Sequence, residues 1–278
     1  MRYYEHLSQK ALWSYRIALL SVLVFAGAFV WHRFFGLPTP IALKATGCAV
    51  AGAVIGLALA VAALISIWNE GYLGAVRASA AVFFSVLVLA VPLWSLPDLL
   101  TLPRLYEVTT DPAAPPAFDR VAKIRQGAAN PVHYDTSFIP LQAAAYPDIR
   151  PLRVQRPLVD VFSSVKDVVK ALNWKVIDEQ APESGRSAHI EAMDRTFFFG
   201  FTDDISIRIT GTAKTAKVDI RSSSRFGQHD LGRNARRVRR FMTEVKLRLA
   251  ELERMDRMER ASALAHQAEE KEKPKPRR

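Results

Sequence analysis

Three uncharged apolar runs occupy the first hundred residues of the chain, at residues 17–31, 45–68 and 78–96. A helix of about 20 residues crosses the hydrocarbon core of a bilayer, which is about 30 Å thick. Trp13 and Phe35 extend the first run toward this length. In the second run, Gly52 and Gly56 form a small-xxx-small pair that favours close helix packing. The pattern predicts a three-helix transmembrane region over residues 1–98.

Basic residues beside the three runs indicate how the helices are oriented. Four of them lie on the side of the amino terminus and three on the other side, and cytoplasmic flanks carry the excess of Lys and Arg. The four are Arg2, Lys10, Arg16 and Arg77, and the three are Arg33, Lys44 and Arg104. We expect a cytoplasmic amino terminus in a bacterial inner membrane, with the carboxy-terminal domain in the periplasm.

Residues 99–156 are rich in proline, since ten of the sixteen prolines of the chain lie between Pro97 and Pro157. Proline interrupts helices and biases its neighbours toward extended conformations. The segment also carries large apolar side chains, such as Tyr106, Phe118 and Phe138, which are unusual in a free linker. We therefore predict an extended connector that packs along the folded domain.

Residues 157–254 alternate between helical and strand periodicity. Val161, Val165, Val168 and Leu172 recur at helical spacing. Alternating apolar positions then predict strands at 174–178, 188–195, 205–210 and 218–221, with turns at 182–185 and near Gly211. A last helix is expected from about Leu231, with Asp230 as its N-cap. The pattern predicts an α+β domain in which two helices cover an antiparallel sheet of about four strands.

Beyond residue 255 the composition turns to Glu, Lys, Arg and Ala and ends in KEKPKPRR. Such a segment buries too little apolar surface to fold by itself. For residues 255–278 we expect a disordered charged tail or a solvated extension of the last helix.

A specific string of residues lies around the last predicted strand and the start of the last helix. It contains Arg221, Ser222, Ser224, Arg225, Gly227, Asp230, Gly232, Asn234, Ala235 and Arg237, and it follows Asp203, Asp204 and the segment Tyr146-Pro147-Asp148. The string resembles the DUF1499 family of unknown function over residues 106–249. The resemblance implies a compact domain, often on a membrane-anchored chain, and implies no established reaction.

The same region supplies the candidate ligand-binding residues. They are Asp203, Asp204, Arg208, Arg221, Ser222, Ser224, Arg225, Asp230, Asn234 and Arg237. The planar guanidinium groups of Arg221 and Arg225 suit anion recognition, but ion pairing with nearby aspartates is favoured. For Asp203 and Asp204, metal binding or acid–base work competes with turn formation, which is favoured.

Three functions remain open at this stage. The leading hypothesis is a noncatalytic envelope protein that binds an anionic ligand, lipid or protein partner through Arg221, Arg225 and the basic side of the last helix. The basic side comprises Arg233, Arg236, Arg237 and Arg240. The second is a hydrolase that uses Asp203, Asp204, Asp230 and His229 around Ser222–Ser224, and the third is a purely structural role.

Charge and composition argue against nucleic-acid binding, an intrachain disulfide, and a metal or cofactor site. The net charge of +11 is accounted for by proximity to anionic lipid, so nucleic-acid binding is not expected. Cys48 is the only cysteine, which excludes an intrachain disulfide. His133, His189 and His229 lack the spacing of a zinc motif, and no phosphate-binding glycine loop is present, so we predict no metal and no cofactor.

Overall fold

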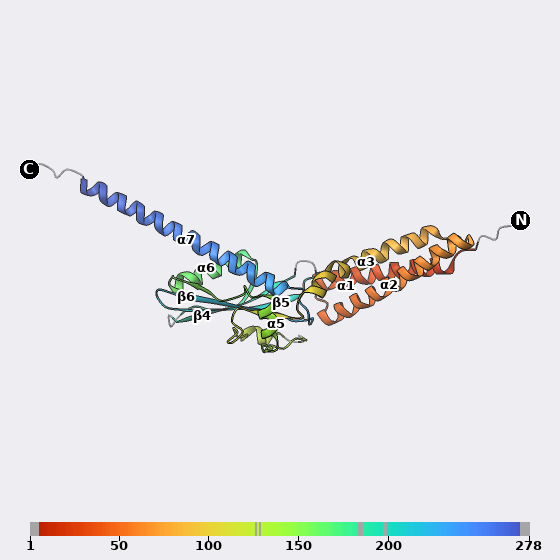
Figure 1. Cartoon of the computed structure of the whole chain (residues 1–278), viewed down its shortest axis with the longest axis horizontal. Helices are drawn as coiled ribbons and strands as arrows, with labels where there is room; N and C mark the ends of the chain where they lie inside the picture. Colours follow the sequence, from red (N-terminus) through yellow and green to blue (C-terminus); the bar gives the residue numbers. More distant parts are fainter. Residues whose placement is uncertain (1–5, 126, 128, 183–185, 197–198, 273–278) are drawn as a thin grey trace, which may run out of the picture. The chain divides into compact units, whose positions relative to one another are not determined.

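The computed structural model describes residues 6–125, 127, 129–182, 186–196 and 199–272, and the chain divides into two compact units. Residues 1–104 and 195–202 form the first unit, and residues 105–194 and 203–278 form the second. Figure 1 shows three N-terminal helices in the first unit and a sheet with helices in the second.

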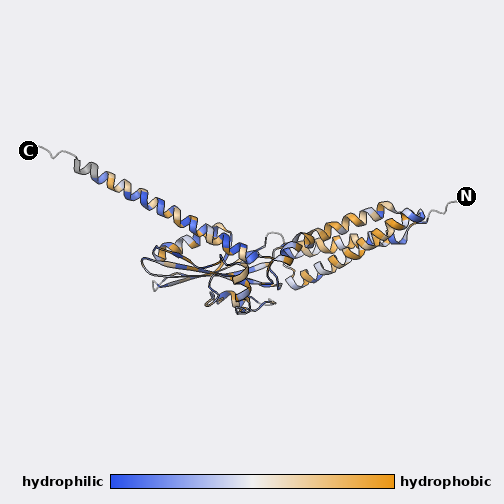
Figure 2. Ribbon diagram, in the orientation of Figure 1, coloured by the Kyte–Doolittle hydropathy of each residue, from blue (hydrophilic) through white to orange (hydrophobic). Residues whose placement is uncertain are grey.

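Three long helices confirm the predicted apolar region. They are α1 (Gln9–Phe34), α2 (Thr39–Glu70) and α3 (Ala75–Thr101). Ser8 caps α1 by accepting a hydrogen bond from the Ala11 amide at 3.3 Å, and α2 ends at Gly71, whose φ is +73°. Each helix is long and apolar enough to cross a membrane. Figure 2 shows apolar residues along most of their length.

Small residues form the contacts between these three helices. The buried groups are alanine clusters, Ala11 with Ala63 and Ala78 in one and Ala18 with Ala60 and Ala81 in the other. A Cβ atom at Gly56 would lie 3.3 Å from the Cβ of Ala18, so this glycine permits the close approach predicted from its spacing. Large side chains such as Leu20 and Phe83 are 60% and 65% exposed. Small residues inside and large apolar residues outside are what a lipid environment favours.

The second unit contains an antiparallel sheet of six strands. Its order is β1-β6-β5-β4-β3, and β2 also pairs with β6. The strands are β1 (Glu107–Thr109), β2 (Leu152–Val154), β3 (Lys175–Gln180), β4 (Ser187–Arg195), β5 (Thr202–Gly211) and β6 (Ala216–Ser224). The four strands expected from alternation are β3 to β6. The sequence pattern missed β1 and β2, because three residues are too few to show a period of two.

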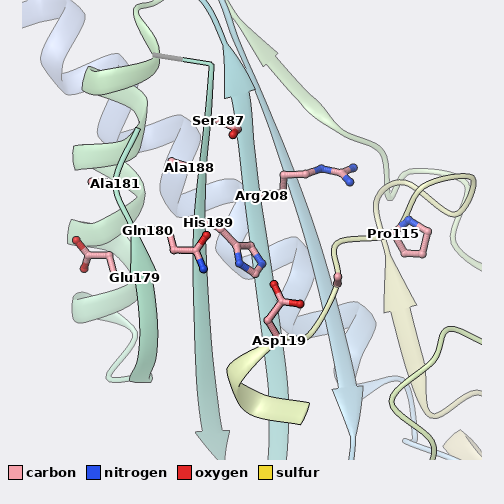
Figure 3. Close-up of a pocket in the computed structure, with 10 residues that line it drawn as sticks. Pro115, Asp119, Glu179, Gln180, Ala181, Ser187, Ala188, His189 and Arg208 are labelled. Carbon is pink, nitrogen blue, oxygen red and sulfur yellow. The ribbon is translucent and has the colours of Figure 1, made fainter. Parts of the chain in front are cut away.

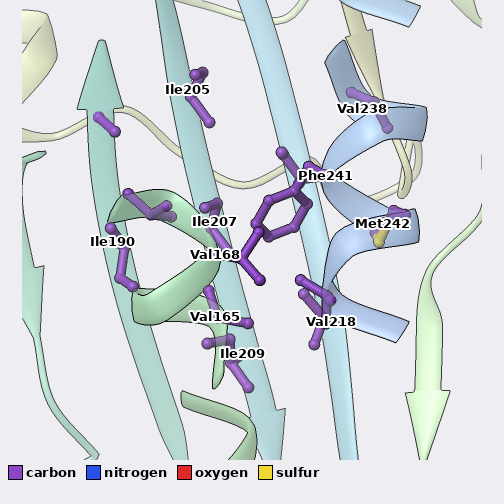
Figure 4. Packing of buried hydrophobic residues seen from close by; sticks show 14 of the residues in the cluster. Val165, Val168, Ile190, Ile205, Ile207, Ile209, Val218, Val238, Phe241 and Met242 are labelled. Carbon is purple, nitrogen blue, oxygen red and sulfur yellow. The ribbon is translucent and has the colours of Figure 1, made fainter. Parts of the chain in front are cut away.

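Two helices cover one face of this sheet, as predicted. They are α6 (Leu158–Ala171), which begins after Pro157, and α7 (Arg233–Glu272). The core between them and the sheet contains Ile205, Ile207 and Ile209 from β5, which are all fully buried, and Phe241 from α7 (Figure 4). The alternation of these isoleucines with polar residues therefore reflects a sheet with one strongly apolar face.

Part of the connector, around Ala117 and Phe118, covers the other face of the sheet, whereas Tyr146 and Asp148 contact Arg239 of α7. The connector is less extended than expected, because it contains β1, β2 and the short helices α4 (Arg120–Ile124) and α5 (Phe138–Ala145). Its aromatic side chains are buried, among them Tyr106, Phe118 and Phe138. Strand residues on this face meet connector backbone, since Ser206 Oγ donates to the Ala117 carbonyl at 2.6 Å. The sheet thus lies between a helical layer and a connector layer.

The ends of two predicted elements differ from the sequence-based expectation. The last helix begins at Arg233 rather than Leu231, because Leu231 and Gly232 have φ values of +54° and +68° and so interrupt the helix. The segment after Met255 is helical as far as Glu272, which corresponds to the solvated-extension alternative over that range. Residues 183–185 of the turn expected at 182–185 lie outside the described residues, as do residues 273–278 of the tail.

Candidate functional site

The strand register divides the candidate residues between the two faces of the sheet. The turn favoured for Asp203 and Asp204 is wrong, because both residues lie in β5, where Asp204 pairs with Ser223 and Asp203 pairs with Ser224. Because side chains alternate along a strand, residues of odd and even number in β5 point to opposite faces. The candidates therefore form two polar clusters, one on each face of the sheet.

The helix-side cluster lies between the sheet and the first turns of α7. Arg237 donates to Asp203 Oδ2 at 2.5 Å, to Asp194 Oδ2 at 2.9 Å and to Ser222 Oγ at 3.0 Å. Asn234 Oδ1 accepts from Ser222 Oγ at 2.7 Å, and its Nδ2 donates to Ser224 Oγ at 3.1 Å. The guanidinium of Arg237 is therefore neutralised by two carboxylates of its own domain.

Asp230 lies three residues before Arg233, the first residue of α7, and its side chain binds the first turn of that helix. Its carboxylate accepts from the Gly232 amide at 2.8 Å and from the Asn234 amide at 2.9 Å. It therefore bonds to the first turn of α7 but does not occupy the N-cap position predicted for it, because the helix begins at Arg233. Burial raises the pKa of the Asp230 carboxyl above its ordinary value by desolvating the charge. His229 Nδ1 accepts from the Leu231 amide at 2.9 Å. Asp230 and His229, two of the four residues named in the hydrolase hypothesis, thus bind backbone amides next to this helix start.

The connector-side cluster centres on Asp204, whose side chain is fully buried. Arg225 donates to its carboxylate through Nε and Nη2 at 2.8–3.0 Å, and Arg125 Nε lies 3.2 Å from Oδ2. Burial raises the pKa of the Asp204 carboxyl and lowers the pKa of the Arg125 guanidinium, because both charges are removed from water. Two arginines on one carboxylate make this a compact charge network with little solvent access.

Arg221 also lies on the connector side of the sheet, but it pairs with Glu107 rather than with Asp204. Its Nε and Nη2 atoms donate to Glu107 Oε2 at 2.9 and 2.6 Å, and its guanidinium lies 4.7 Å from the ring centroid of Phe118. The side chain of Arg221 is only 3% exposed. Burial raises the pKa of the nearby Tyr134 hydroxyl to about 12. The guanidinium group of Arg221 is thus bonded to the carboxylate of Glu107 and stacked on the ring of Phe118.

Glu107 and Arg125 are important members of these networks that sequence reasoning missed. They lie in the connector, 114 and 98 residues from the side chains they contact in β6. Ion pairs at this separation have no periodic signal, so only the fold brings them together. Arg208 is the candidate nearest to solvent, and it donates to Asp219 Oδ2 at 3.0 Å and lies 3.4 Å from Asp111 Oδ2.

A surface pocket of about 820 Å³ lies beside this cluster, between β3, β4 and the connector (Figure 3). Asp119, Glu179, His189 and Arg208 line it, and of these only Arg208 was a predicted candidate. Asp119, His189 and Glu191 bring potential metal-ligating atoms within 4.8 Å of one another. The prediction that no histidine serves a metal rested on spacing along the chain, which does not show this arrangement.

Exposed arginines lie along the first turns of α7. We call Arg233, Arg236 and Arg240 the arginine flank. Arg236 and Arg240 are exposed and Arg233 is half-buried, whereas Arg237, which was predicted to share this side, is buried. Residues 233–247 contain six basic residues and a single acidic one, Glu244. This stretch of the helix therefore presents positive charge to solvent.

Comparison with known families gives one match. The model for a family described as "Protein of unknown function (DUF1499)" matches residues 107–245, which include both polar clusters and the start of α7. A comparison with curated proteins finds no match.

Proposed function

The chain belongs to the DUF1499 family of proteins of unknown function, and from this premise we propose that it is a membrane-anchored, noncatalytic protein. Its three N-terminal helices hold the domain at a bilayer, and the arginine flank binds the headgroups of acidic lipids. The observation that carries the proposal is that the start of α7, which bears the flank, is hydrogen-bonded to Leu105 and Tyr106, the first residues of the domain.

Two hydrogen bonds tie the start of α7 to the beginning of the domain. The Asp230 amide donates to the Leu105 carbonyl at 2.8 Å, and Asn234 Nδ2 donates to the Tyr106 carbonyl at 2.9 Å. Helix α3 ends at Thr101, four residues before Leu105. Four extended residues span at most about 14 Å. Because this connection is short, we place the start of α7, and with it the arginine flank, close to the lipid surface.

The charge of the flank suits that surface. A basic side chain near an anionic leaflet contributes about 1 kcal/mol of binding free energy, so three give about 3 kcal/mol. The buried arginines do not add to this value, because Arg221, Arg225 and Arg237 are paired with acidic groups of the domain. The proposal therefore assigns lipid binding to the exposed Arg236 and Arg240 and the half-buried Arg233. Arg221 and Arg225, which were predicted to bind the anion, have no part in it.

The polar clusters favour a structural role over a hydrolytic one. A nucleophilic serine needs a base within hydrogen-bond reach, but Ser222 is bonded to Asn234 and Arg237. Asp203 and Asp204 each bind an arginine. We propose that these clusters lock the sheet to α7 on one side and to the connector on the other.

The orientation of the anchor is part of the same proposal. The flanking charges favour an amino terminus in the cytoplasm. Three spans then place the carboxy-terminal domain on the far side of the membrane, which is the periplasm in a Gram-negative inner membrane. The anionic lipid would be met in the outer leaflet of that membrane.

The test of the lipid-binding proposal is a titration of the detergent-solubilised full chain with short-chain phosphatidylglycerol. We expect the variant R233Q/R236Q/R240Q to bind about a hundredfold more weakly at low salt, because about 3 kcal/mol is lost. The matched control is R254Q/R257Q/R260Q, which removes three exposed arginines farther along the same helix. Phosphatidylcholine of the same chain length is the neutral probe.

The two triple variants distinguish a localised site from a general charge effect. Equal losses in both would contradict the proposal, since the net charge changes equally in each. Unchanged binding in the flank variant would contradict it as well. A difference between the variants that disappears at high salt is expected, because exposed charges are screened.

A further inference from the structure

A histidine and two carboxylates converge beside the surface pocket, which two of them, Asp119 and His189, line. His189 and Glu191 are two residues apart on β4 and so lie on the same face of the sheet. Asp119 comes from the connector at the start of α4, and Figure 3 shows its carboxylate beside the His189 ring. One ligand atom from each of the three residues lies within 4.8 Å of the others.

The hydrogen bonds around His189 assign its tautomer. Ser206 has a single hydroxyl proton, which it donates to the Ala117 carbonyl at 2.6 Å. Its oxygen must therefore accept from His189 Nε2–H, which lies 2.8 Å away. In the neutral ring this leaves the lone pair on Nδ1, which lies 3.9 Å from Glu191 Oε1. An N–H donor on one ring nitrogen and a lone pair on the other is the state in which histidine binds metals.

The backbone holds Glu191 in place. Its side chain is fully buried, and its two oxygens accept from the amides of Asp119, Arg120 and Val121 at 2.6, 3.2 and 2.6 Å. Oε1 accepts two of these hydrogen bonds and Oε2 accepts one, so the bonds fix the orientation of the carboxylate and leave acceptor capacity on Oε2. The same bonds fix the backbone of Asp119. Two of the three groups are therefore preorganised, and the third is on an exposed side chain that is able to rotate.

We propose that Asp119, His189 and Glu191 form a binding site for a divalent transition-metal ion, with Zn²⁺ as the best match. Imidazole nitrogen with carboxylate oxygen suits Zn²⁺, at about 2.0–2.2 Å from each ligand. Tetrahedral ligands at these bond lengths lie about 3.3–3.6 Å from one another. The site therefore closes when Asp119 rotates inward and His189 Nδ1 and Glu191 Oε1, now 3.9 Å apart, approach each other slightly. Three protein ligands leave one position open, and it faces the pocket of about 820 Å³.

The test is Zn²⁺ titration of the full chain in detergent, without an affinity tag and after treatment with EDTA, using a chromogenic chelator as competitor. We expect one equivalent to bind, with at least tenfold weaker affinity in D119N and in H189A. The control is E179Q, because Glu179 lines the same pocket but pairs with Lys166 at 2.5 Å. Its affinity should equal that of the unsubstituted chain.

The variants differ in how much they disturb the fold. H189A loses a hydrogen bond to Ser206, whereas Asp119 is exposed and D119N keeps its size. D119N is therefore decisive if H189A does not fold, and Co²⁺ absorption gives a second readout, since loss of one ligand changes its visible bands. Absence of stoichiometric binding, or equal affinity in D119N and the unsubstituted chain, would show a purely structural ion pair and overturn the proposal.

Discussion

Replacing Asp204 by Ala should destabilise the soluble domain by about 3–5 kcal/mol. The carboxylate of Asp204 is fully buried between Arg125 and Arg225, whose side chains are 1% and 15% exposed. Removal of the carboxylate leaves two cations in a region with little water, and an unpaired buried charge is far more costly than the loss of an ion pair. Hydrogen exchange of the full chain in detergent measures the effect locally, and protection should be lost in β5 and β6.

The control for this prediction is D167A. Asp167 pairs with Arg248 at 2.8 Å, but the two side chains are 53% and 40% exposed. Exposed pairs contribute at most about 1 kcal/mol, so protection should change little. If D204A behaved like D167A, the connector-side cluster would not stabilise the fold, and the argument that its arginines are unavailable to an external anion would fail.

Replacing Phe241 by Ala should cost a similar amount, about 3–5 kcal/mol, for a different reason. Phe241 is fully buried on the inner side of α7 (Figure 4). Its ring stacks on Trp174, with the two ring centroids 5.6 Å apart. Truncation leaves a cavity between α7, α6 and the sheet, which these neighbours are unable to fill without moving. Guanidinium unfolding of the full chain, followed by circular dichroism, is the measurement.

The substitution F241L separates cavity formation from loss of the aromatic contact. Leucine keeps much of the buried volume, so F241L should retain most of the stability that F241A loses. A loss in F241L as large as in F241A would indicate that stacking on Trp174, rather than filling of the core, is the main contribution of Phe241.

The longer strands and helices were predictable because the apolar period that defines each of them lies within one short stretch of sequence. Ile205, Ile207 and Ile209 alternate with polar residues, and Val161, Val165 and Val168 follow a helical period, so strand and helix could be assigned from the sequence. The three-residue strands β1 and β2 have no comparable signal. Their pairing with β6 depends on the path of the connector, which local patterns do not specify.

The candidate site was predictable only in part. Alternation correctly indicated that Asp219 and Arg221 share a face, and the register places them opposite Arg208 and Ser206. It did not supply Glu107, the partner of Arg221, because that contact joins residues 114 positions apart. The same limit applies to Asp119, since the shared face of His189 and Glu191 is visible in the sequence but the connector residue beside them is not.

The most direct test of membrane anchoring uses alkaline phosphatase fused to the carboxy terminus in a Gram-negative host. The account rests on three helices that each contain a long apolar segment and carry large apolar side chains on their exposed surfaces. After alkaline carbonate extraction and ultracentrifugation, the fusion should remain in the membrane pellet and be enzymatically active, because the reporter matures in the oxidising periplasm. An inactive fusion in the pellet would reverse the proposed orientation. A fusion recovered in the supernatant would contradict the membrane anchor itself and, with it, the lipid-binding role of the arginine flank.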